Sequence, residues 1–219
     1  DSPPPPGRFS VAAATSVVDM PRFGGLLRSL PRFEAVAAGA GIANSFPDDD
    51  GVVRQMPLVF QVGETLYPSL ALEAVRIRRG AGALLLQPTA RRHIAAVGID
   101  DLEIPTDGAG RVWAPLARFD IPRTPAYAVL ANGALPQAFT DKVVFVGVSA
   151  SGVAPEVPIG DGKRAPSHHL QAAATAALLI GAAGYRPDYI LFAEAAAATL
   201  ACIVFLGFAV AGRRNLALA

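Results

Sequence analysis

The residues best placed to do chemistry lie in the stretch Gly147-Val148-Ser149-Ala150-Ser151, directly after an apolar run. This stretch is close to the pattern Gly-x-Ser-x-Gly, in which a sharp turn from strand to helix exposes a nucleophilic serine. Asp161 and His168 follow in the order serine, acid, base that one class of hydrolases uses. However, Ser151 stands where the pattern has its last glycine, and the Gly and Pro residues that follow Ser149 oppose the required helix. Acyl transfer by Ser149 is therefore an alternative hypothesis, and a strand end leading into a loop is the simpler interpretation.

The same loop and two histidines are the candidates for binding a small ligand. The backbone amides around Ser149 and Ser151 could bind a small anion. His168 and His169 are adjacent, so on a helix they point about 100° apart and cannot chelate one metal ion together. Surface positions at the start of a helix are the simpler interpretation of both histidines. We therefore predict Ser149, Ser151, His168 and His169 as ligand-binding residues, and we expect neither a metal ion nor a cofactor.

Three consecutive acids, Asp48-Asp49-Asp50, precede Gly51. A calcium loop of the EF-hand type alternates its ligands and ends in a bidentate glutamate, which this stretch lacks. The pattern therefore predicts a tight turn between two strands.

Composition excludes several classes of function. The 219 residues carry a formal net charge of +1, which is not the charge of a protein that binds nucleic acid. The one cysteine excludes an intrachain disulfide and a cysteine metal cage. Hydrophobic residues make up 52% of the chain and charged residues 17%. This hydrophobic excess is concentrated at one end.

The apolar segment 189–211 reads YILFAEAAAATLACIVFLGFAVA. As a helix it would be about 34 Å long, enough for a bilayer core of about 30 Å. Its one charge, Glu194, lies in the first third, where insertion costs less than at the centre. Arg213 and Arg214 follow, and the positive-inside rule places them in the cytoplasm. We predict a transmembrane helix in contact with lipid, with residues 1–187 outside the cytoplasm; a buried core helix is the alternative.

Strand and helix patterns mix along the remaining chain, which predicts an α/β or α+β fold with a mixed sheet and flanking helices. Helices are expected at residues 31–38, 69–79, 125–131 and 166–182. Strands are expected at residues 11–18, 42–46, 52–62, 94–97, 99–104, 111–116 and 142–148, the last covered on both faces. Residues 106–110 read as a hairpin connection and 149–165 as a loop.

Four segments, in this order and spacing, together resemble the second type of CHASE domain, an extracellular sensor associated with cyclases and histidine kinases. They are Asp49-Asp50-Gly51-Val52-Val53-Arg54 with Met56-Pro57-Leu58, then residues 67–74 (YPSLALEA), Ile104-Pro105-Thr106-Asp107, and residues 141–149 (DKVVFVGVS). The resemblance implies a bacterial sensor outside the cytoplasm, followed by membrane helices and a cytoplasmic cyclase or kinase. It therefore implies an inner-membrane location, a dimer, and a small ligand or envelope signal, with any catalytic activity beyond residue 219.

The chain departs from this family before its last predicted helix. The family usually has a stretch like Pro-Gly-Val-Glu-Ile-His, whereas this chain has Pro166-Ser167-His168-His169-Leu170-Gln171. His169 replaces the acid and Gln171 the histidine, so a ligand that those groups hold in the family is expected to be bound differently here or not at all.

These inferences divide the chain into five parts, and we expect them to belong to a longer protein. They are a Pro-rich lead-in (1–9), a sensor domain (10–183), a juxtamembrane joint (184–188), a transmembrane helix (189–212) and a cytoplasmic start (213–219).

Overall fold

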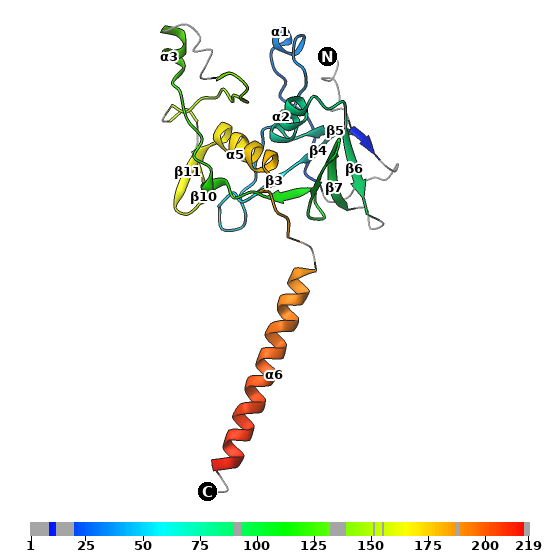
Figure 1. The fold of residues 1–219 in the computed structure, drawn as a ribbon, viewed down its shortest axis with the longest axis vertical. Helices are drawn as coiled ribbons and strands as arrows, with labels where there is room; N and C mark the ends of the chain where they lie inside the picture. The colour runs from blue at the N-terminus through cyan, green and yellow to red at the C-terminus, as the bar shows by residue number, and fades with distance from the viewer. Residues whose placement is uncertain are drawn as a thin grey trace. The chain divides into compact units, whose positions relative to one another are not determined.

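The computed structural model describes residues 9–11, 20–89, 93–131, 139–150, 152–154, 156–186 and 189–216, with backbone only at 9–11, 191 and 209–216. The chain forms two compact units, Asp1–Tyr185 and Arg186–Ala219. The first unit mixes short strands with helices, as expected for an α/β or α+β domain (Figure 1).

Within the described residues the strands form four small sheets. The largest has the order β1-β6-β7-β8, with β1 parallel to β6 and the other pairs antiparallel. Its strands are Phe9–Val11, Leu84–Pro88, Ile94–Ile99 and Leu102–Pro105. A second sheet joins β2 (Arg22–Phe23), β4 (Val59–Val62) and β5 (Thr65–Pro68). The two remaining sheets are the pairs β3 (Gln55–Pro57) with β9 (Arg111–Trp113) and β10 (Glu156–Gly160) with β11 (Lys163–Pro166).

Two helices build the core of the first unit, and they lie side by side (Figure 1). Helix α2 (Leu70–Arg79) begins after Ser69, whose hydroxyl accepts a hydrogen bond from the Leu72 N–H at 3.1 Å, and ends at Gly80 in the left-handed conformation. Helix α5 (Ser167–Leu179) is rich in alanine and buried over most of its length. Both predictions are confirmed because the caps and the apolar faces are local signals.

The core is one apolar cluster that joins these helices to the largest sheet. It includes Leu72 and Val75 of α2, Leu84 and Val97 of the sheet, and Leu170 of α5, all fully buried. The shorter helices are α1 (Pro31–Glu34), the 3₁₀ turn η1 (Leu116–Arg118) and α3 (Ala126–Ala131).

The predicted strand at 142–148 is wrong. The segment has no regular secondary structure, no strand of the described chain pairs with it, and the Val146 side chain is 91% exposed. An apolar run becomes a strand only where a neighbouring backbone completes its hydrogen bonds, and composition cannot supply that neighbour.

The predicted loop at 149–165 is also wrong in its second half, which forms the β10–β11 hairpin. Asp161 and Gly162 occupy its two-residue turn with φ of 52° and 69°. An Asp-Gly pair is a strong hairpin signal, because a type I′ turn needs positive φ at both residues.

Two further strand predictions need correction, and a third is tested only at its first residue. Residues 106–110 turn the chain, but β9 then pairs with β3 and not with β8. Of the predicted strand 42–46, only Ile42 makes a bridge, to Ser69. The first strand is Phe9–Val11, and residues 12–18 lie outside the described chain.

The second unit contains helix α6 (Ile190–Leu216), where a helix was predicted. Its phenylalanines Phe192, Phe205 and Phe208 are each about three-quarters exposed. Among the described residues, no helix is long and apolar enough to cross a membrane. The side chains of residues 191 and 209–216 and all of residues 217–219 lie outside that description. The transmembrane span stays a prediction.

Candidate functional site

A pocket of about 450 Å³ opens in the first unit between four segments, which lie between Met20 and Arg111 in the sequence. Its lining residues are Met20 and Pro21, residues 46–49, Gln55 and Pro57 of β3, and Ala109 with Arg111. Pockets of this volume are in the range that holds small molecules. The lining is mixed, because it contains the carboxylates of Asp48 and Asp49 and the guanidinium of Arg111 as well as apolar side chains.

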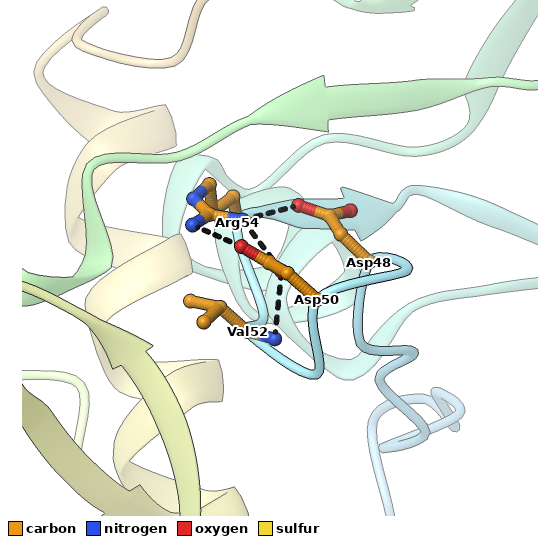
Figure 2. A network of polar contacts seen from close by, with 4 residues as sticks. All are labelled: Asp48, Asp50, Val52 and Arg54. Atoms are coloured by element: carbon orange, nitrogen blue, oxygen red, sulfur yellow. Dashed lines mark hydrogen bonds and ion pairs between the residues drawn. The ribbon is translucent and has the colours of Figure 1, made fainter.

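The acidic wall of the pocket is a tight turn, as the sequence predicts. The Gly51 N–H donates to the Asp48 carbonyl at 2.8 Å, and the Asp48 N–H donates to the Val52 carbonyl at 2.9 Å. The Asp50 carboxylate accepts from the Val52 N–H at 3.1 Å (Figure 2). These bonds hold Asp48 and Asp49 in the rim of the pocket.

Arg54, directly before β3, binds two aspartates of this turn. Figure 2 shows its guanidinium between Asp48 and Asp50, with Nη2 2.7 Å from Asp50 Oδ2 and Nη1 3.2 Å from Asp48 Oδ2. A second bond joins Arg54 Nη1 to Asp50 Oδ1 at 2.9 Å, so Asp50 holds the guanidinium in a two-pronged contact. The hydrogen bonds from Arg54 and from the Val52 N–H lower the pKa of Asp50 to about 2.

Replacing Arg54 by glutamine is expected to raise the pKa of Asp50 from about 2 toward its ordinary 3.8, because the largest cause of the shift is lost. The wild-type pKa is lowered by folding, so the contribution of Asp50 to stability is present above pH 3.8 and is lost as the pH falls toward 2. Titration of the side-chain carboxyl ¹³C shift measures the change. Arg164→Gln, at an exposed position of β11, is the control; an Asp50 pKa that shifts equally in both variants would contradict the assignment.

Two further lining residues, Ala109 and Arg111, are held by Asp107, which is 9% exposed. Its Oδ1 accepts from the N–H groups of Ala109 at 3.0 Å and Arg111 at 2.8 Å, and its Oδ2 accepts from Arg111 Nε at 2.8 Å. One carboxylate thus shapes the turn before β9 and orients the Arg111 side chain. The two outer nitrogens of Arg111 have no hydrogen bond within the part of the chain that the structure describes.

The pocket shares strand β9 with the end of the first unit. Two residues after Arg111, the Trp113 N–H donates to the Gly184 carbonyl at 2.7 Å, and the Gly184 N–H donates back to the Trp113 carbonyl at 2.9 Å. A single short strand therefore runs from the pocket wall to the last residues before the second unit.

The residues predicted to bind a ligand lie elsewhere, and their role stays a prediction. Ser149 is exposed at the end of the irregular segment 142–149, and Ser151 lies outside the described residues. His168 is half-buried beside that segment: a Cβ on Gly147 would lie 2.4 Å from the His168 ring. His169 is only 8% exposed, so the surface position expected for it is wrong.

Burial lowers the pKa of His169, and the neighbouring Arg123 and His168 lower it further. Arg123 Nη2 lies 3.4 Å from its Nδ1. No hydrogen bond links Ser149 to either histidine in the described ranges, and the chain continues from Ser149 into a turn and the β10 strand. The helix that a nucleophile elbow requires does not follow.

The residues predicted to meet the membrane all belong to the second unit. Glu194 pairs with Arg186, whose Nη2 lies 2.7 Å from both carboxylate oxygens. The backbone of Arg213 and Arg214 continues helix α6, and their side chains are outside the description.

Sequence reasoning identified the turn at 48–51 but not the pocket beside it. Gln55 and Arg111 stand on strands that the sequence does not pair, so nothing local connects them with the aspartates. The usable signal was the acidic run with Arg54 four residues after Asp50, which indicates an ion-paired loop. In the described chain, no group of three or more His, Cys, Asp or Glu residues could hold a metal ion.

Comparison with known proteins supplies the family. The CHASE2 domain family matches residues 9–211, which is most of the chain. No curated protein and no solved structure matches the chain. CHASE2 domains are extracellular sensory domains and are not themselves catalytic. The chain therefore belongs to the CHASE2 domain family and is a sensory module.

Proposed function

We propose that this chain is the extracytoplasmic sensory module of a bacterial transmembrane receptor that controls a cytoplasmic nucleotide cyclase or kinase. The observation that carries the proposal is the match of the CHASE2 family over residues 9–211. Such domains are sensory modules of membrane receptors. A homodimer belongs to the proposal, because the outputs that the resemblance implies usually act as dimers.

We propose further that residues 189–212 anchor this module in the inner membrane. The sequence from 189 to 211 contains one charged residue, and α6 is continuous from Ile190 to Leu216. A helix of that length spans about 40 Å, more than a bilayer core of about 30 Å. Two arginines follow the apolar run and favour a cytoplasmic C-terminal end, which places residues 1–187 on the other side.

Cysteine labelling of intact cells tests this topology. Cys202→Ser removes the one cysteine of the chain, and Glu64→Cys then places a thiol in the exposed turn between β4 and β5. In the full-length protein, a maleimide that cannot cross membranes is expected to label residue 64 in intact spheroplasts. Leu218→Cys in the same background is the matched control and should react only after the membrane is broken. Labelling of residue 64 only after lysis would contradict the proposal.

No described contact favours the alternative of an envelope hydrolase using Ser149. The Ser149 side chain is exposed, no described hydrogen bond joins it to His168 or His169, and the family is sensory.

A further inference from the structure

The charges around the pocket do not balance. The pocket wall carries two carboxylates, those of Asp48 and Asp49, against one guanidinium group, that of Arg111. The difference is one negative charge. In a hollow with low-dielectric walls, such an excess attracts a cation and repels an anion.

The excess negative charge lies on Asp48 and Asp49 at the rim of the pocket. Arg54 makes its two shorter bonds to Asp50, which leaves Asp48 with one bond of 3.2 Å. The Asp49 side chain is exposed and has no ion pair or hydrogen bond to another described residue. Two carboxylates on the pocket wall therefore have acceptor capacity to offer a ligand.

Apart from Arg111, the remaining lining is suited to an organic group and not to a bare metal ion. Phe46 is 41% exposed, and its ring is held by the rings of Phe23 at 6.3 Å and Phe60 at 6.5 Å between centroids. Met20 and Pro57 are buried beneath the pocket. An aromatic face attracts an ammonium group, and the apolar residues can pack against the alkyl part of a ligand that carries one.

A neutral amide in the lining can also orient the ligand. Gln55 lines the pocket, and its side-chain amide has no hydrogen-bond partner within the described part of the chain. An amide both donates and accepts, so it can bind a polar group of the ligand at the end away from the ammonium.

We infer that this pocket binds a small organic cation, with its ammonium group against Asp49, Asp48 and the Phe46 ring. The inference rests on the proposed sensory function and names the ligand class that the module senses. Strand β9 contributes both Arg111 to the pocket and Trp113 to the contact with Gly184, so an occupied pocket is linked to the end of the first unit.

The test is calorimetric titration of the full chain in detergent with butylammonium chloride, compared with its neutral analogue 1-butanol. The wild type is expected to bind butylammonium at least about tenfold more tightly than 1-butanol, and Asp49→Asn should weaken the cation about tenfold, since one charge-assisted bond is lost. Phe46→Leu should weaken binding by a few fold, because the aromatic face is lost. Asp161→Asn, in the β10–β11 turn, is the matched control and should bind as the wild type does.

Equal affinity for the amine and the alcohol, or an Asp49→Asn variant that binds butylammonium unchanged, would overturn the inference. Binding of calcium chloride that depends on Asp49, with no binding of butylammonium, would also overturn it in favour of a metal site. The titration does not depend on membrane topology, and the cysteine labelling does not depend on a ligand. The inference and the proposed function can therefore fail separately.

Discussion

Replacing Arg76 by alanine is expected to lower the free energy of unfolding by about 3–5 kcal/mol, the largest effect that we predict for a single substitution. Glu73 and Arg76 are 4% and 5% exposed on the buried side of α2. Arg76 Nε and Nη2 lie 2.8 and 2.7 Å from the two Glu73 carboxylate oxygens, and Nη1 donates to the Ala81 carbonyl at 2.6 Å. The alanine variant would leave the Glu73 charge buried without its counter-ion.

Denaturant unfolding of the full chain, followed by the fluorescence of its single tryptophan, Trp113, measures this loss. Arg78→Ala, on the exposed side of the same helix, is the matched control and should change stability by less than about 0.5 kcal/mol. The double variant Glu73→Leu with Arg76→Leu should recover most of the loss, because no buried charge is then left unpaired. A loss for Arg76→Ala no greater than that for Arg78→Ala would show that the pair is not buried.

Replacing Gln171 by leucine is expected to cost about 1–3 kcal/mol, because a buried backbone donor loses its acceptor. Gln171 is 1% exposed on α5, and its Oε1 accepts from the Ala71 N–H at 3.1 Å while its Nε2 donates to the Ala43 carbonyl at 3.1 Å. The Ala71 N–H is in the first turn of α2 and has no partner within that helix. Gln171 therefore caps a helix from which it is separated by 100 residues.

Hydrogen exchange of the Ala71 amide tests this role directly. In Gln171→Leu the exchange rate should rise by about tenfold or more, which corresponds to at least about 1.4 kcal/mol of lost protection. The control is Gln87→Leu on β6, a half-buried glutamine whose side chain has no hydrogen bond among the residues described. Unchanged exchange at Ala71 would contradict the capping role and leave only a packing role for Gln171.

Gln171 also shows how far the sequence could be taken. At the sequence level it stands out only because it replaces a histidine of the family, which suggested a changed ligand site. The structure gives it a structural role instead, in the contact between α2 and α5. Its partners lie far away in the chain, so no local pattern could identify them.

What the sequence determined by itself is the set of elements whose signals are local. Ser69 and Gly80 mark the ends of α2, the acidic run before Gly51 forms the predicted turn, and alanine-rich α5 lies where expected. The four segments that resemble CHASE domains also led to the correct family. Caps, turns and helical periodicity depend on residues within a few positions of one another, so they can be recognised before the fold is known.

Only the tertiary structure decided which segments meet. It pairs β9 with β3, leaves residues 142–148 without a described partner strand, and closes the pocket from segments between Met20 and Arg111. Gly39 shows the same dependence, because a Cβ there would lie 1.7 Å from the Glu73 carboxylate and the close approach is visible only once the helix is in place. Strand pairing and pocket formation depend on hydrogen bonds and burial between distant residues, and these are settled by packing of the whole domain and not by the residues beside them.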